Sequence, residues 1–176
     1  DAACFIGYHA MAMTHRGNLA HTYSGAFRSC HVNGRALGEI GMNAMLAASY
    51  GAPLVFVSGD TQACAEARAL LPGIGTAAVK EAMGFRATKS LHPANAREAI
   101  AAGVKKALSG PKPKTTRLPR APFTLDVDLA ATYQADVCEM VPGFTRKSST
   151  RIEFQAKDFL TIYKAFLTIM RIVPRQ

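Results

Sequence analysis

The sequence has 176 residues, of which 49% are hydrophobic, so it can bury the core of one domain or of one domain with a small lobe. No run of about 18 apolar residues occurs, which argues against a membrane-spanning helix. The net charge of +9 would suit an anionic partner, but the basic residues are not interleaved with aromatic ones and no nucleic-acid-binding motif occurs. We therefore expect a globular protein that binds neither a membrane nor nucleic acid.

The first 110 residues alternate apolar runs with helical patterns, which is typical of an α/β protein whose sheet is covered by helices. The pair Asn33-Gly34 lies at the centre of an apolar segment and predicts a hairpin turn. Asp60 is a suitable N-cap for a following helix, and Pro93 suits the first turn of another. In chain order we expect a strand at 3–7, a hairpin at 27–37, a helix at 38–50, strands at 54–57 and 76–79 separated by a helix at 60–71, and a helix at 92–109.

A second, smaller α+β unit is predicted after a basic, proline-rich connector. Residues 123–129 alternate apolar with polar side chains, as a half-buried strand does. A helix at 130–141, a strand at 149–154 and a helix at 157–173 complete it. The last helix carries an apolar stripe, which we interpret as core or subunit contact. The stripe consists of Phe159, Tyr163, Phe166, Met170 and Val173.

The predicted fold class is therefore α/β, with residues 1–110 as the strand-helix alternating sheet domain and residues 123–176 as the smaller C-terminal α+β unit. The connector at 111–122 carries the densest group of cations, which we interpret as a solvated linker. These are Lys112, Lys114, Arg117 and Arg120.

The cysteines are widely spaced and form no C-x-x-C pair. We interpret them as reduced thiols, which favours the cytoplasm, with disulfide bridges as the alternative. They are Cys4, Cys30, Cys64 and Cys138.

His9, His21 and Glu39 are the candidate functional residues, because each follows a predicted strand or begins a helix, where sites are usually built. Neutral imidazole is a common zinc ligand, and a carboxylate can hold a second position. A loop histidine such as His21 can act as a base, a nucleophile or a hydrogen-bond donor. The alternatives are a hydrogen-bonded structural histidine at each position and a favourable first-turn charge at Glu39. His15, His31 and His92 have no neighbouring residues that suggest a shared site.

Six short motifs in order along the chain resemble the zinc-dependent D-aminopeptidase family associated with dipeptide-permease operons. The resemblance covers essentially the whole sequence. The motifs are Gly7-Tyr8-His9-Ala10, Ala20-His21-Thr22, Gly38-Glu39-Ile40-Gly41 with Asn43-Ala44, Gly59-Asp60, Thr76-Ala77-Ala78-Val79-Lys80, and Phe154-Gln155-Ala156-Lys157-Asp158.

This resemblance implies a cytoplasmic metallopeptidase that hydrolyses N-terminal D-residues, such as D-Ala, from short peptides. It also implies a homodecamer with active sites facing an internal chamber and two zinc ions (Zn²⁺) per complete subunit. By motif matching, His9 and Glu39 correspond to ligands of one zinc. His21 corresponds to the catalytic histidine, as nucleophile or general base.

Two departures from the family pattern bear on the function. An N-terminal Asp-x-Glu-Gly motif and a further histidine ligand are missing, and the loop between His9 and His21 is one residue longer. We therefore expect the sequence to lack the N-terminal part of the family's catalytic domain. The alternative is a truncated, non-catalytic remnant that keeps only packing and oligomer contacts.

Overall fold

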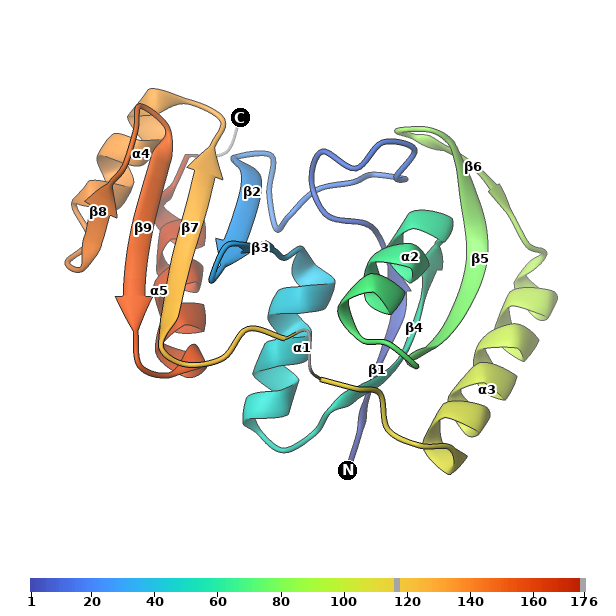
Figure 1. The fold of residues 1–176 in the computed structure, drawn as a ribbon. Helices are drawn as coiled ribbons and strands as arrows, with labels where there is room; N and C mark the ends of the chain where they lie inside the picture. Colours follow the sequence, from blue (N-terminus) through green and yellow to red (C-terminus); the bar gives the residue numbers. More distant parts are fainter. Residues whose placement is uncertain (116–117, 175–176) are drawn as a thin grey trace.

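The computed structural model describes residues 1–115 and 118–174, and its strands form two sheets (Figure 1). Arg117 of the basic connector lies outside the described residues. The elements, in order, are β1 (Ala3–Tyr8), β2 (Phe27–Val32), β3 (Arg35–Ala36), α1 (Glu39–Ser49), β4 (Leu54–Asp60), α2 (Thr61–Leu70), β5 (Gly75–Gly84), β6 (Ala87–Ser90), α3 (Pro93–Ser109), β7 (Phe123–Leu129), α4 (Thr132–Glu139), β8 (Phe144–Arg146), β9 (Arg151–Ala156) and α5 (Phe159–Ile172).

The first sheet has the order β1-β4-β5-β6, with β1, β4 and β5 parallel and β6 antiparallel to β5. Every residue of β4 is buried, as expected for a strand covered on both faces. The helices α2 and α3 pack on opposite sides of this sheet (Figure 1). Among the described residues, no helix has the length and apolar character needed to cross a membrane.

The second sheet is antiparallel and has the order β3-β2-β7-β9-β8. Strand β7 alternates buried with half-buried side chains, which confirms its predicted period of two. The hairpin between β2 and β3 turns at Asn33-Gly34, where both residues have positive φ, as a type I′ turn requires. The helix α1 lies between the two sheets, in contact with α5 on one side and with β1 and β4 on the other (Figure 1).

The α/β fold class and the order of the predicted elements are confirmed. The sequence analysis missed β6, whose side chains are all exposed, and the short strand β8, because neither has a clear apolar pattern. The hairpin β2–β3 pairs with β7, so the two sheets do not divide the chain at the connector. The proposed boundaries at 1–110, 111–122 and 123–176 remain a prediction.

The cysteines form no disulfide in the described part of the chain, and all but the half-buried Cys4 are buried. Burial raises the pKa of each thiol, and it raises that of Cys138 to about 12. Inert, protonated thiols agree with the interpretation of these residues as reduced core side chains.

The apolar stripe of α5 packs into the core. Phe159, Phe166 and Val173 are buried, whereas Tyr163 and Met170 lie at the edge of the stripe and are only partly buried. Ile162 and Ile169 also belong to its buried face. The ring of Phe166 lies 5.0 Å from that of Tyr23 and 5.3 Å from that of Phe27. This helix therefore ties the second sheet to the loop that precedes β2.

Replacing Phe166 by alanine is expected to lower the free energy of unfolding by about 3–5 kcal/mol, because it leaves a cavity among buried rings. Urea unfolding followed by circular dichroism measures the change. Leu108→Ala on α3 is the matched control, since that side chain is 59% exposed and its loss should be close to neutral. A near-neutral Phe166→Ala variant would show that the face is not core.

Candidate metal centre

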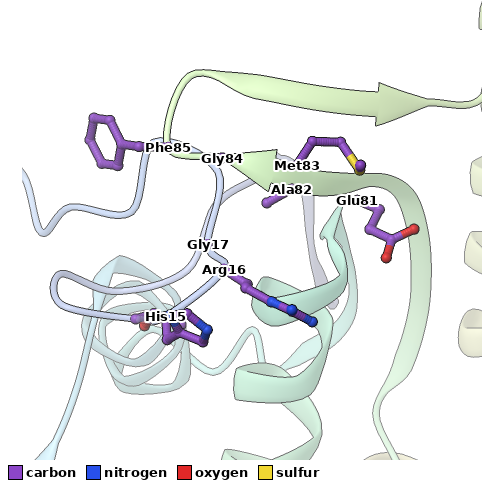
Figure 2. Close-up of a pocket in the computed structure, with 9 residues that line it drawn as sticks. His15, Arg16, Gly17, Glu81, Ala82, Met83, Gly84 and Phe85 are labelled. Atoms are coloured by element: carbon purple, nitrogen blue, oxygen red, sulfur yellow. The ribbon is translucent and has the colours of Figure 1, made fainter.

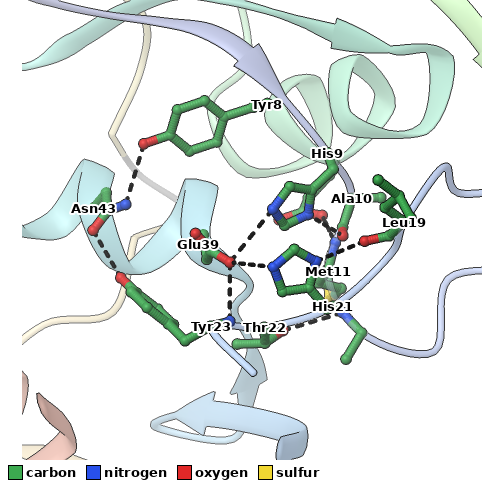
Figure 3. Close-up of polar contacts among 12 residues, drawn as sticks. Tyr8, His9, Ala10, Met11, Leu19, His21, Thr22, Tyr23, Glu39 and Asn43 are labelled. Atoms are coloured by element: carbon green, nitrogen blue, oxygen red, sulfur yellow. Dashed lines mark hydrogen bonds and ion pairs between the residues drawn. The ribbon is translucent and has the colours of Figure 1, made fainter. Parts of the chain in front are cut away.

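Three side chains from separate segments converge beyond the carboxyl end of β1 (Figure 3). His9 follows β1, His21 lies in the loop before β2, and Glu39 is the first residue of α1. The Nε2 atoms of His9 and His21 lie 3.4 Å and 3.5 Å from the same oxygen, Oε1 of Glu39. One nitrogen or oxygen atom from each side chain lies within 4.8 Å of the other two. The structure thus brings together the three residues that the sequence analysis singled out.

The end of β1 reaches this position through a close approach to β4. The pairing of β1 with β4 shifts register between Phe5 and Tyr8, and Gly7 has a φ of 77°, so the strand bulges just before His9. A side chain at Gly59 would collide with the carbonyl oxygen of Tyr8. The glycine of the Gly59-Asp60 motif is therefore needed for β1 to deliver His9 at this point.

The loop between His9 and β2 adopts a costly backbone conformation. Met13, Arg16, Leu19 and Tyr23 all have positive φ, a region that side chains with a Cβ rarely occupy. Such strain persists only where surrounding contacts determine the conformation, and it is common at functional sites.

Polar contacts from three directions hold this loop. The N–H of Asn18 donates to the buried Asp60 carboxylate over 2.7 Å, while Asp60 also caps α2 through Ala63. The N–H of Leu19 donates to the carbonyl of Phe85 at the tip of the β5–β6 turn, 2.8 Å away. The N–H of Ala12 donates to the hydroxyl of Thr22. His21 is therefore positioned by the first sheet and not by its own loop alone.

The hydrogen bonds of the two imidazoles determine which nitrogen is free. The Nδ1 atom of His9 lies 3.0 Å from the carbonyl oxygen of Ala10, and that of His21 lies 2.6 Å from the carbonyl oxygen of Leu19. Because a carbonyl oxygen can only accept, each Nδ1 carries the proton in these bonds. Nε2 of each ring therefore faces Glu39: a protonated ring donates from it to the carboxylate, and a neutral ring presents there the lone pair that a metal-ligating histidine uses.

The electrostatics favour an ionised carboxylate in the centre of the site. Burial alone would raise the pKa of Glu39, but hydrogen bonds from His9 and from the N–H of Tyr23 outweigh it and lower that pKa. The hydrogen bond to Glu39 raises the pKa of His9. A carboxylate with two imidazole nitrogens is a donor set that suits zinc.

The two imidazole rings are stacked, and this limits how they can act together. Their centroids lie 4.0 Å apart and their planes are inclined by only 17°. An imidazole binds zinc in its own ring plane at about 2.0–2.1 Å. Because the two ring planes are nearly parallel, the line along which they intersect lies much farther from both Nε2 atoms than a zinc–nitrogen bond is long. In this arrangement His9 and His21 do not present in-plane lone pairs to one shared ion.

A polar network behind Glu39 connects the site to the second sheet. Asn43, one turn after Glu39 on α1, accepts hydrogen bonds from the hydroxyls of Tyr23 and Tyr163 over 2.8 Å and 2.9 Å. Its amide nitrogen donates to the hydroxyl of Tyr8, 3.2 Å away (Figure 3). Burial, followed by the bond to Tyr163, raises the pKa of Tyr23, which keeps this hydroxyl protonated. Residues next to His9 and Glu39 are thereby tied to α5.

A surface pocket of about 550 Å³ lies next to the histidine loop, between residues 14–17 and the β5–β6 turn (Figure 2). His15, Arg16, Glu81 and Phe85 are among its lining residues. None of the three converging side chains lines it. The pocket thus lies beside the triad of His9, His21 and Glu39 and does not contain these side chains.

The remaining histidines lie apart from the triad. His15 lines the surface pocket, His31 lies on β2, and His92 caps α3 by accepting from the N–H of Ala94. The sequence analysis missed Glu66 of α2, which accepts the N–H of Met11 just after His9 and belongs to none of the motifs. It treated Asn43 only as a motif letter and predicted Asp60 only as a helix N-cap, because their other partners are distant in sequence.

Comparisons with known proteins identify the family of the chain. A model of the M55 peptidases, described as D-aminopeptidase, matches residues 1–168. The chain belongs to this D-aminopeptidase family. A D-aminopeptidase of Bacillus subtilis (strain 168) is 37% identical over 175 residues, which make up 98% of this chain and 63% of that protein.

A solved structure shows the same fold as this family member. It is described as the Zn-dependent D-aminopeptidase DppA from Bacillus subtilis, a self-compartmentalizing protease. The TM-score is 0.92 at 35% identity, and the match covers 99% of this chain and 64% of the solved one. The chain therefore spans a little under two thirds of the length of the relatives that it matches.

The stability of the metal-free protein is expected to fall as the pH rises from 5 to 7. Burial raises the pKa of Glu66 from 4.5 to about 7, so the folded state holds this proton more tightly than the unfolded state does. The resulting stability is fully present below the unfolded pKa and is lost as the pH rises through the folded one.

Glu66→Gln carries no such proton, so it should gain about 2–3 kcal/mol relative to the wild type between pH 5 and pH 7.5. Urea unfolding at both pH values measures this gain. Glu98→Gln, at an exposed position on α3, is the control and should follow the wild type. Parallel pH profiles for the wild type and Glu66→Gln would contradict the prediction.

Proposed function

We propose that this chain is the metal-binding part of a zinc aminopeptidase that hydrolyses N-terminal D-residues, such as D-Ala, from short peptides. The observation that carries the proposal is the convergence of His9, His21 and Glu39, with both Nε2 atoms facing one carboxylate oxygen. Membership of the D-aminopeptidase family and the zinc dependence named for the solved relative support it.

His9 and Glu39 are assigned as ligands of one zinc ion. Zinc usually takes three or four protein ligands, and with His21 assigned to catalysis only His9 and Glu39 of the converging residues remain for this zinc ion. The relatives are longer than this chain, so a longer chain has room for the remaining ligands of two zinc ions. Bound zinc would supply Lewis-acid polarisation of the scissile carbonyl and activation of water.

His21 is assigned as the catalytic group, acting as general base or nucleophile. Its stacking on His9 is an argument against its sharing the zinc ion that His9 binds. Its side chain is 41% exposed, against 20% for His9, so it is the more accessible of the two to a substrate. The bond from Nδ1 to Leu19 directs its Nε2 at the site, where it can accept or deliver a proton.

We also propose that the subunits assemble into a homodecamer in the cytoplasm, with the sites facing an internal chamber. The description of the solved relative as self-compartmentalizing supports assembly. Large apolar side chains exposed at the end of β5 and in the β5–β6 turn offer contact surface for other subunits. They are Met83 and Phe85.

A non-catalytic remnant that keeps only packing and oligomer contacts is the second candidate function. The incomplete ligand set among the described residues favours it. Zinc content separates the two candidates, because a remnant would bind well under one zinc ion per chain.

Zinc per chain is expected to rise to about two when the protein is extended at its N-terminus to the length of its relatives. Elemental analysis after dialysis, on this chain and on the extended one, measures it. An extended chain that binds no zinc would sink the proposed function. Two tightly bound ions in the present chain would instead mean that other residues complete the site.

His21→Ala in the extended protein is expected to keep its zinc and to lose turnover by a factor of at least 100, because it removes the proposed acid-base group. His9→Ala and Glu39→Ala should lose zinc as well as activity. Hydrolysis of a D-alanyl dipeptide, assayed alongside the metal content, distinguishes the two classes. His31→Ala on β2 is the control. Wild-type turnover by the His21 variant would contradict its role, and loss of zinc would make it a ligand.

A further inference from the structure

Glu66 is a carboxylate inside the protein that touches both chain segments that deliver the proposed zinc ligands. It projects from α2 and accepts a hydrogen bond from the N–H of Met11, with 2.8 Å between nitrogen and Oε2. Met11 lies two residues after His9, so this bond holds the main chain just where it leaves the site. The bond spans 55 positions in the sequence and is independent of the strand pairing of β1.

The other carboxylate oxygen of Glu66 faces the segment that precedes Glu39. A Cβ atom built on Gly38 would lie 2.9 Å from Oε1 of Glu66 and 2.5 Å from Cβ of Met11. Gly38 is the N-cap of α1, and Glu39 is the first residue of that helix. Met11, Gly38 and Glu66 are therefore packed so closely that only a glycine fits between the other two.

This arrangement carries an energetic cost. Oε1 of Glu66 is buried and has no hydrogen-bond partner among the described residues, although a cavity of about 80 Å³ next to the side chain has room for water. A buried polar atom without a partner destabilises the folded state. Leucine would fill a similar space without this cost. It would not accept the N–H of Met11.

We propose that Glu66 is a positioning residue, whose carboxylate fixes the chain after His9 against the segment before Glu39 and so sets the separation of these two zinc ligands. The inference rests on the proposed function. Outer groups that orient the ligands of a metal typically change its affinity by 10–100-fold when they are removed. Such outer groups usually bond to the ligating side chains themselves. Glu66 instead acts on the ligands through the main chain.

The test compares Glu66→Leu with Glu66→Gln, which keeps an oxygen to accept the N–H of Met11. All variants are made in the extended protein. Zinc affinity is measured by competition with a chromophoric chelator, and the geometry of the site is followed by the visible spectrum of the cobalt(II) form. We expect Glu66→Leu to bind zinc 10–100-fold more weakly and with a changed cobalt spectrum. The zinc affinity of Glu66→Gln should stay within about threefold of that of the wild type. Glu98→Leu, on the exposed face of α3, is the control and should bind zinc as the wild type does.

Gly38→Ala is the second variant, because its new methyl group would push Met11 and the Glu66 carboxylate away from α1 without removing that carboxylate. It should weaken zinc binding in the same direction. If Glu66→Leu does not fold, the zinc affinity of Gly38→Ala tests the inference, and an affinity equal to that of the wild type would overturn it.

Wild-type zinc affinity and cobalt spectrum in Glu66→Leu would overturn the inference, and so would an equal loss in Glu66→Gln. Both outcomes leave the proposed function standing, since the wild type still binds zinc. An extended wild-type protein that binds no zinc would instead overturn the proposed function itself.

Discussion

A single carboxylate oxygen, Oε1 of Glu39, is the point on which the arrangement of the site depends. It lies within 3.5 Å of both histidine Nε2 atoms and accepts the N–H of Tyr23 over 2.9 Å. Three segments that are distant in sequence therefore meet at one negative charge. Burial works against that charge, and the hydrogen bonds from His9 and Tyr23 overcome the effect, as the lowered pKa of Glu39 indicates.

Because α1 carries this oxygen, the position of α1 decides whether the site forms. The helix lies between the sheets and contacts β1, β4 and α5 (Figure 1). Asn43 binds tyrosines from the first sheet, the loop and α5, so the same helix face that presents Glu39 also joins the two halves of the molecule. The second sheet, which contributes no residue to the triad, thus supports its geometry from behind.

The helix α2 supports the site from the other side. Its N-cap Asp60 holds Asn18 in the strained loop that carries His21, and Glu66 holds Met11 in the segment after His9. Both carboxyl groups accept from backbone N–H groups. The bond from Asn18 to the buried Asp60 offsets the cost of positive φ at Arg16 and Leu19, on either side of Asn18.

The sequence by itself determined the α/β class, most element boundaries and the three candidate site residues. Alternating patterns, caps such as Asp60 and the Asn33-Gly34 turn act over a few residues, so they can be read locally. Only the tertiary structure decided that the hairpin β2–β3 joins β7, that the two imidazoles stack, and that Glu66 touches both ligand segments. These contacts join residues far apart in the chain, and their geometry depends on how helices and sheets pack, which no local pattern encodes.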